Sequence, residues 1–166
     1  MAIDPKIPVE PFRLFHGTTK IALRSILQQG LKPHMSKDQA NRGNHNIDRK
    51  GVYLTNCYWL ANDFAEVARD IRGGGDIVIL EIDVSKIDMT ALEPDDYDLQ
   101  DCIDGGEEGQ DGIDPRVAHL KNWSEASWQL SLAVTKEVVY SKLIPPSAIK
   151  VISSSLNPDQ ITPGLA

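Results

Sequence analysis

The chain has 166 residues, of which 41% are hydrophobic and 25% are charged, proportions that are ordinary for a single soluble globular domain. The net charge of −7 fits poorly with RNA binding, and the two cysteines, Cys57 and Cys102, suggest neither a disulfide framework nor a zinc site. No apolar run approaches the roughly 18 residues of a membrane span, and residues 1–11 lack the order of a signal peptide. We therefore expect a protein of the cytoplasm, or one delivered into a target cytosol, without a membrane partner.

The first half of the chain alternates short apolar strands with amphipathic helices. Three prolines predict an extended arm over residues 1–11. The elements expected after it are a buried strand at 12–15, a helix at 19–29 ended by Gly30, a polar loop at 32–50, a strand at 51–55, a helix at 58–71 and a nearly continuously apolar, central strand at 76–84. A polar loop as long as 32–50 is typical of a functional lid.

The second half begins with a strongly acidic stretch. Residues 93–114 hold ten acidic residues and no basic one, and we interpret 93–116 as an acidic loop. The elements expected after it are a helix at 124–134 opened by Ser124, a strand at 137–144, a last strand from Ala148 and a polar tail at 157–166. Strands outnumber helices and few βαβ units occur, so the sequence predicts a single α+β domain over residues 1–166.

Several familiar motifs are missing from the chain. There is no GxxxxGK[ST], GxGxxG, GxSxG or HExxH, and the four histidines are scattered, which argues against a metal site. Three separate pieces remain: "FHGTT" at 15–19, "GVYLT" at 51–55 and "TKEVVYSKLIPP" at 135–146. Each has an ordinary structural explanation when taken alone, because a His-Gly pair often forms a turn, Tyr53 can be a packing residue and Glu137 can be a solvated charge.

Taken together and in order, the three pieces resemble the diphtheria-toxin and poly(ADP-ribose) polymerase type of ADP-ribosyltransferase, whose signature is His, Tyr and Glu on three core strands. His16-Gly17-Thr18 is similar to the family's H-G-[ST] motif. "GVYLTNCYWLANDF" is similar to its second motif, with Tyr53 followed eleven positions later by Phe64. Glu137 matches the third motif, and "EVVYSKLIPPSAI" also resembles DarT-type DNA ADP-ribosyltransferase toxins. The resemblance implies split antiparallel β-sheets flanked by helices.

The resemblance also implies how NAD would be bound as co-substrate. Gly17 would use its backbone N–H and C=O on the carboxamide, and a methyl group added at Gly17 would occupy that space. His16 would hydrogen-bond a ribose hydroxyl, with Thr18 beside it. Tyr53 and Phe64 would stack on the two faces of the nicotinamide ring. We expect the loop 32–50 to close over the pyrophosphate.

Catalysis would depend on Glu137, with His16 and Tyr53 completing the catalytic set. When nicotinamide leaves, the ribose becomes cation-like, and a nearby carboxylate stabilises that charge without a metal. We expect the strand that Glu137 begins to run beside "FHGTT". The implied activity is that of a mono-ADP-ribosyltransferase, a glycosyltransferase that cleaves the nicotinamide–ribose bond and transfers ADP-ribose, as a toxin or effector does.

The sequence departs from the family pattern at two positions and leaves alternatives open. Ala61 stands where the polymerase branch has a serine, and Thr135 stands where arginine-specific members are acidic, which makes arginine a less favoured acceptor. One alternative is an RNA 2′-phosphotransferase, whose His-Gly follows an arginine, whereas here Phe15 precedes His16. The other is a non-catalytic NAD- or ADP-ribose-binding module, which an NAD hydrolysis assay would distinguish.

The partners that the resemblance implies are NAD and a macromolecular acceptor, either protein or nucleic acid. A regulatory or antitoxin protein is a further partner expected of a toxin. The residues from 93 to 114 do not favour nucleic acid locally, because their charge is uniformly negative.

Overall fold

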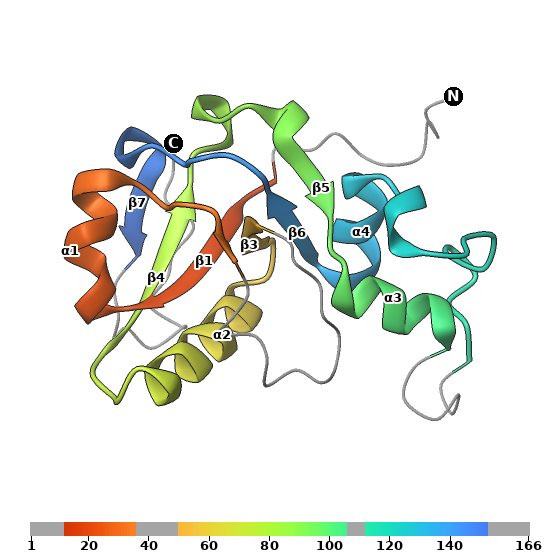
Figure 1. Cartoon of the computed structure of the whole chain (residues 1–166), viewed down its shortest axis with the longest axis horizontal. Helices are drawn as coiled ribbons and strands as arrows, with labels where there is room; N and C mark the ends of the chain where they lie inside the picture. Colours follow the sequence, from red (N-terminus) through yellow and green to blue (C-terminus); the bar gives the residue numbers. More distant parts are fainter. Residues whose placement is uncertain (1–11, 36–49, 106–111, 153–166) are drawn as a thin grey trace.

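The computed structural model describes residues 12–35, 50–105 and 112–152 of the chain (Figure 1). Its strands are β1 (Leu14–Thr19), β2 (His34–Met35), β3 (Lys50–Thr55), β4 (Ile77–Ile82), β5 (Leu92–Pro94), β6 (Glu137–Tyr140) and β7 (Ile149–Ile152). Its α-helices are α1 (Lys20–Gln29), α2 (Tyr58–Ile71), α3 (Tyr97–Asp104) and α4 (Trp128–Thr135). The α+β class is confirmed. The predicted arm at 1–11, tail at 157–166 and most of the predicted lid at 32–50 lie outside the described residues.

The strands form an antiparallel sheet in the order β5-β6-β3-β1-β4-β7, with β2 paired to β3. β1 pairs with β4 along its whole length, and β3 pairs with β6 along most of its length. Between β1 and β3, however, the ladder holds a single pair, Phe15 with Thr55. The sheet therefore opens in its middle into two halves, one built on β3 and β6 and the other on β1 and β4.

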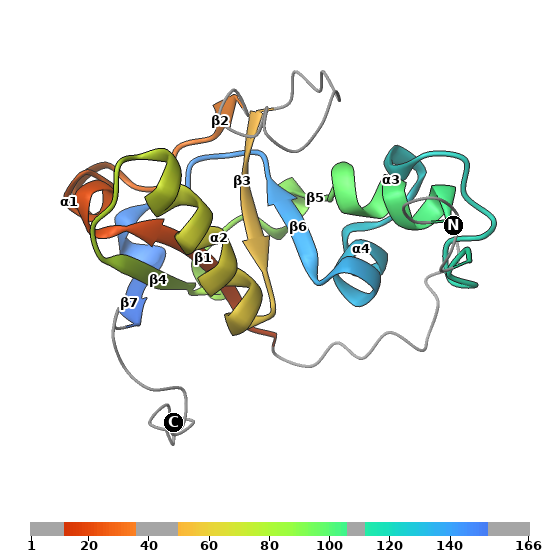
Figure 2. The same ribbon diagram turned by 90° about the horizontal axis from the view of Figure 1, so that it is seen from below.

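The two faces of the β1–β4 half are covered by different helices. Leu14 and Leu80 belong to a core cluster with Ile26 of α1, whereas Phe15 and Ile79 belong to a cluster with α2 (Figure 2). This follows from the strand period of two, which sends successive side chains to opposite faces. The helix predicted at 58–71 is confirmed residue for residue, because its apolar positions recur with the helical period.

The predicted acidic loop at 93–116 is wrong over much of its length. Glu93 and Pro94 belong to β5, and residues 97–104 form α3, which packs beside α4 at the far end of the sheet (Figure 1). Leu99 and Ile103 point from α3 into a separate small core with Val117. Apolar residues four positions apart form a helical face, and the many carboxylates concealed this spacing when the segment was interpreted by charge alone.

Three other boundaries differ by four residues from those predicted, and the remaining ones by at most two. β1 extends to Thr19 instead of ending at Phe15, so the His-Gly-Thr motif lies within a strand and not after one. The helix predicted at 124–134 begins only at Trp128, and its cap is Ser127, whose Oγ accepts a hydrogen bond from the N–H of Leu130 at 3.1 Å. The strand that starts at 137 ends at Tyr140, because the chain then turns toward Pro145.

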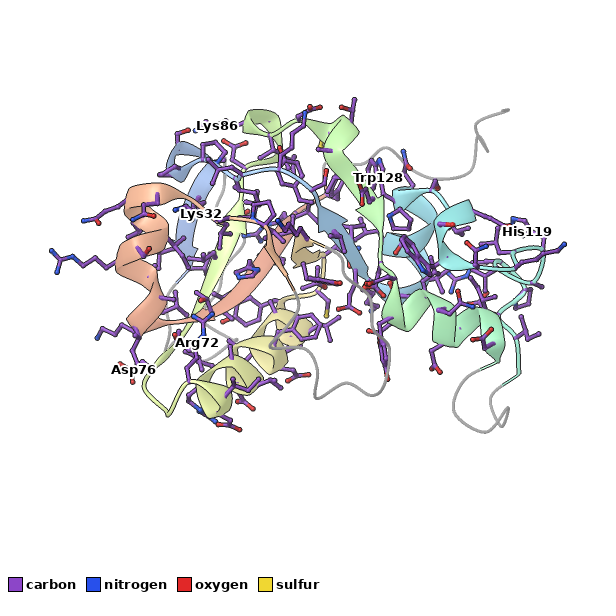
Figure 3. The ribbon with its side chains drawn as sticks, in the orientation of Figure 1. Lys32, Arg72, Asp76, Lys86, His119 and Trp128 are labelled. Atoms are coloured by element: carbon purple, nitrogen blue, oxygen red, sulfur yellow. The ribbon has the colours of Figure 1, made fainter. Side chains whose placement is uncertain are left out.

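The β5–β6 segment comprises the described residues between β5 and β6, 95–105 and 112–136. Trp128 lies where this segment meets the sheet and packs on Phe12, with ring centroids 5.3 Å apart. His119 lies at its outer end, away from the sheet (Figure 3). The longest described helix, α2, has 14 residues, and nothing in the described part of the chain has the length and apolarity of a membrane-spanning helix.

Thr19, at the end of β1, provides a test of the packing. Its side chain is 0% exposed, and its Oγ1 has no hydrogen-bond partner among the described residues. A buried hydroxyl without a partner costs about 1–3 kcal/mol. We expect Thr19→Val to raise the free energy of unfolding by about 1 kcal/mol, measured by urea denaturation. Thr55→Val is the matched control, since the Thr55 Oγ1 accepts from the N–H of Cys57 at 3.0 Å, and it should destabilise. Equal effects of the two substitutions would contradict the explanation.

Candidate functional site

Residues far apart in the sequence meet where the sheet opens. Thr55 of β3 pairs with Phe15 of β1 on one side and with Glu137 of β6 on the other, so the three lie in one row. His16 follows Phe15, and Tyr53 lies two positions before Thr55. His16, Tyr53 and Glu137 therefore come from three adjacent strands. The expectation that the Glu137 strand runs beside β1 is wrong, because β3 lies between β6 and β1.

Strand alternation determines which of these side chains share a face. Cross-strand partners point to the same side of a sheet, as do residues two apart on one strand. Tyr53 and Glu137 thus lie on the same face as Phe15, which is the face that α2 covers. His16 and Thr18 start from the opposite face, with Leu14 and Leu80, and the His16 ring reaches the opening at the Tyr53 carbonyl. Phe64 is a half-buried residue of α2, in the turn between Ala61 and Ala65 that packs on this face. The stacking of Tyr53 and Phe64 on two sides of one ring stays a prediction.

His16 bridges the opening between β1 and β3. Its Nδ1 lies 2.9 Å from the backbone oxygen of Tyr53. A carbonyl oxygen only accepts hydrogen bonds, so Nδ1 carries the proton in this contact. In the neutral ring Nε2 is then the accepting nitrogen, which suits a ligand hydroxyl as donor.

Gly17 directs its backbone toward the same opening. The N–H of Lys20 donates to the carbonyl of Asp76 at 2.9 Å, and hydrogen-bonded pairs alternate along an antiparallel ladder. Counting back in this register, His16 and Thr18 bond to β4, and Gly17 turns its N–H and C=O toward the β3 side. The β1–β3 ladder offers no partner there in the described residues, since its one pair lies at Phe15.

The expected reason for a glycine at position 17 is wrong. A Cβ added there would overlap the carbonyl oxygen of Ala61 and would lie 2.8 Å from the backbone nitrogen of Ala65. The missing side chain is thus required by the close approach of α2. It does not clear the space that we expected the carboxamide to occupy. That the backbone N–H and C=O of Gly17 bind the carboxamide stays a prediction.

Tyr53 is held at both ends. Its backbone carbonyl accepts from His16, and its hydroxyl donates to Oδ1 of Asp96 at 2.8 Å. Asp96 is 3% exposed and belongs to the β5–β6 segment. The sequence analysis did not identify this contact, because nothing in the local pattern links a strand tyrosine to an aspartate more than forty residues later.

Glu137 is not a solvated charge. Its side chain is 1% exposed, and its backbone is fixed by a tight turn from α4, in which Lys136 has φ of 65°. The N–H of Glu137 donates to Thr135 Oγ1 at 3.2 Å, and its carbonyl accepts from Ser131 Oγ at 2.8 Å. These bonds fix the backbone position from which the Glu137 side chain extends. A buried carboxylate acts in a lower dielectric, where charge interactions are stronger than in water.

Asp95 and Asp98 are site residues that the sequence interpretation missed. Continuing the β5–β6 register brings Asp95 opposite Glu137, and carboxylate oxygens of Asp95, Asp98 and Glu137 lie within 4.8 Å of one another. Oxygen donors suit a hard cation such as Mg²⁺ or Ca²⁺. One Asp95 oxygen is already used, however, because Oδ2 accepts from the N–H groups of Asp98 at 2.7 Å and Leu99 at 3.2 Å. That no metal is needed stays a prediction.

The charge state of Asp95 is unusual. Burial raises its pKa to about 6, with smaller contributions in the same direction from the negative charges of Asp98 and Asp96. The hydrogen bonds from the α3 backbone oppose the shift. A sequence signal was present, since an aspartate placed before Leu99, Cys102 and Ile103 is a helix-capping pattern.

This pKa predicts a pH-dependent stability. Because the folded-state pKa of Asp95 lies above its ordinary value of 3.8, the folded protein binds this proton more tightly than the unfolded chain does. The stabilisation is complete at low pH and is lost as the pH rises from 3.8 to about 6. Over that interval we expect wild type to lose stability relative to Asp95→Asn by up to about 1.4 kcal/mol per pH unit. Urea denaturation at several pH values measures this. The control is Asp101→Asn, which changes an exposed residue on the same helix and should follow the pH dependence of wild type. If the stabilities of wild type and Asp95→Asn change in parallel with pH, the assigned role of Asp95 is contradicted.

The fold and the site together define the class: an α+β protein whose central sheet opens between two strands, with a histidine, a tyrosine and a buried glutamate around the opening. No protein-family model matches the chain, and no match is found among curated proteins.

Proposed function

We propose that this protein is an NAD-dependent mono-ADP-ribosyltransferase with the split-sheet fold of that family. One observation carries the proposal: His16, Tyr53 and Glu137 lie on the adjacent strands β1, β3 and β6, around the place where β1 and β3 separate. The three motifs had been matched by their order in the sequence alone. Their placement on adjacent strands is independent support, because it depends on strand pairing that the motifs do not contain. Tyr53 and Glu137 share one face, and the His16 ring joins them from the opposite face through the Tyr53 carbonyl.

Nicotinamide would enter the opening with its carboxamide against Gly17. A carboxamide presents one acceptor and two donor hydrogens, and the N–H and C=O of a single strand residue complement it. The register directs these two groups of Gly17 toward β3. Ala61, which stands where related enzymes have a serine, is 0% exposed and packs beneath Gly17. The backbone of Gly17 would therefore hold the carboxamide without help from that position.

The nicotinamide ring would lie between Tyr53 and Phe64. Tyr53 points to the face that α2 covers, and Phe64 is carried by α2. Flat aromatic faces attract a flat cationic ring through stacking and cation–π interaction. The Nε2 atom of His16 would accept from a ribose hydroxyl, with Nδ1 kept protonated by the Tyr53 carbonyl.

Glu137 would supply the electrostatic part of catalysis. The bond between nicotinamide and ribose breaks with its electron pair leaving on the nicotinamide nitrogen, so positive charge develops on the ribose. The acceptor then attacks the ribose C1 and releases its own proton. A carboxylate fixed nearby stabilises the developing charge more than it stabilises bound NAD. The fixed backbone of Glu137 suits this role. Its side chain is 1% exposed, so the ribose would have to displace the groups that cover the carboxylate.

Two further observations bear on the acceptor of ADP-ribose and on the RNA 2′-phosphotransferase alternative. Thr135 donates to the carbonyl of Ser131 at 2.9 Å and accepts from Glu137 N–H, so it holds the turn and is not presented to an acceptor. This supports an acceptor other than arginine. Phe15, which stands where RNA 2′-phosphotransferases have an arginine, is 5% exposed and packs with Ala61 and Ala65. No residue there meets an RNA phosphate.

The test uses the whole chain with two forms of labelled NAD. Label on nicotinamide measures cleavage, and label on the adenylate measures transfer to macromolecules of a cell lysate. We expect both signals, and treating halves of the lysate reaction with nuclease or protease identifies the acceptor class. Cleavage without transfer would make the protein an NAD hydrolase. Binding without cleavage would support the non-catalytic module, and neither binding nor cleavage would reject the proposal.

A further inference from the structure

The contact between Tyr53 and Asp96 joins two separate parts of the fold. Tyr53 belongs to the sheet, whereas Asp96 belongs to the β5–β6 segment, whose small core around Leu99 and Val117 is distinct from the sheet core. The Tyr53 hydroxyl donates a hydrogen bond to Asp96 Oδ1 at 2.8 Å. A hydrogen bond to a carboxylate is about twice as strong as one between neutral groups.

The position of Asp96 is fixed by the chain on each side of it. The N–H of Asp95 donates to Ser131 Oγ at 2.8 Å, and the same hydroxyl donates to the carbonyl of Glu137. The helix α3 begins directly after Asp96, and the carboxylate of Asp95 accepts hydrogen bonds from two N–H groups of its first turn. A path therefore leads from His16 through Tyr53 to Asp96 by hydrogen bonds, along the chain to Asp95, and from there through Ser131 to the backbone of Glu137.

We propose that Asp96 is a positioning residue that orients the Tyr53 ring for stacking on nicotinamide. The inference rests on the proposed function. The phenol of Tyr53 is anchored at its far end by Asp96, and its backbone is anchored by His16. A ring fixed at both ends loses little further freedom when a ligand stacks on it, so binding is stronger. In this way the β5–β6 segment contributes to NAD binding without touching NAD.

The role makes separate expectations for binding and for turnover. Asp96→Ala removes the acceptor, and Tyr53→Phe removes the donor while keeping the ring. Each should raise KM for NAD about tenfold, the size of one lost hydrogen bond to a charged group, and leave kcat within about threefold. Asp96→Asn keeps an accepting oxygen and should rescue KM to within about threefold of wild type. Because the two groups act through one bond, the double variant Asp96→Ala with Tyr53→Phe should be no worse than either single change.

A readout without NAD separates this inference from the proposed function. In tyrosine-labelled protein, NMR measures how slowly the Tyr53 hydroxyl proton exchanges with water. We expect exchange to be slow in wild type and Asp96→Asn and fast in Asp96→Ala. Tyr140, whose hydroxyl accepts from the N–H of Asp88 at 3.1 Å, is the control and should not change.

The outcomes distinguish the two claims. Wild-type turnover together with faster hydroxyl exchange and an unchanged KM in Asp96→Ala would overturn the positioning role and leave the proposed function standing. Slow exchange in wild type without any NAD binding would reject the proposed function, and the positioning role with it. Should Asp96→Ala fail to fold, Tyr53→Phe and Asp96→Asn decide the matter, because a KM unchanged in Tyr53→Phe contradicts the inference by itself.

Discussion

Replacing Glu137 by glutamine should lower the turnover of NAD about 100-fold or more and change NAD binding only a few-fold. Glutamine keeps the size of the side chain and deletes its charge, so the substitution isolates the electrostatic contribution. The ribose carries more positive charge in the transition state than in bound NAD. Loss of the carboxylate therefore raises the barrier to cleavage more than it weakens binding. Nicotinamide release measures kcat, and calorimetry with NAD measures Kd.

Glu66→Gln is the control for the change in net charge. Glu66 is exposed on α2, and its Oε1 accepts a hydrogen bond from Asn62 Nδ2 at 3.4 Å. We expect wild-type kcat and KM from this variant. Thermal unfolding of Glu137→Gln should stay close to that of wild type, so that lost activity is not lost folding. If folded Glu137→Gln cleaves NAD at the wild-type rate, the protein is not the enzyme proposed above.

Replacing Gly17 by alanine should destabilise the whole fold. The added methyl group would collide with the carbonyl oxygen of Ala61 and approach the nitrogen of Ala65 to 2.8 Å, and both are backbone atoms of a helix that cannot turn aside. Either α2 must lift away from β1 or the strand must shift. Overpacking of this kind costs about 3 kcal/mol or more when backbone has to move. Urea denaturation measures the loss, and a stability within error of wild type would contradict the close packing of α2.

Gly73→Ala is the matched control for Gly17→Ala. Gly73 has φ of +89° and nothing within 4 Å of an added Cβ. Its substitution tests backbone strain alone, for which we expect about 1–2 kcal/mol. The larger effect at Gly17 would then be attributable to contact with α2. If Gly17→Ala also weakens NAD binding, displacement of the strand explains the loss. The result would therefore not test whether the Gly17 backbone binds the carboxamide.

The sequence alone determined most elements whose packing follows a simple period. Residues 58–71 were predicted as a helix with the correct bounds, and the strand predicted at 76–84 is present as β4 (Ile77–Ile82). The α+β class followed from these elements. Local side-chain patterns are enough to predict these elements. An amphipathic helix shows its buried face by the spacing of its apolar residues, and a central strand shows its burial by a continuous apolar run, whichever element packs against it.

The acidic residues were wrongly predicted to lie in a loop where their burial depends on residues distant in the sequence. Asp95 and Asp96 fall in the predicted acidic loop, but they are 2% and 3% exposed. Their burial depends on Ser131 and Tyr53, which lie elsewhere in the chain. A local sequence window contains none of these partners. Glu137 is a similar case, since its burial depends on the strands and helices packed around it.

The three site motifs were found in the sequence, but their geometry was decided by strand pairing. Sequence order could not show that β3 lies between β1 and β6, or that β1 and β3 separate after Phe15. It also could not show which way Gly17 points, because a shift of one residue in register reverses every side chain and every backbone group of a strand. The tertiary structure shows that the Cα hydrogen of Gly17 that a side chain would replace faces α2, and that its backbone N–H and C=O face the opening. Register is a property of paired strands, and no single strand sequence contains it.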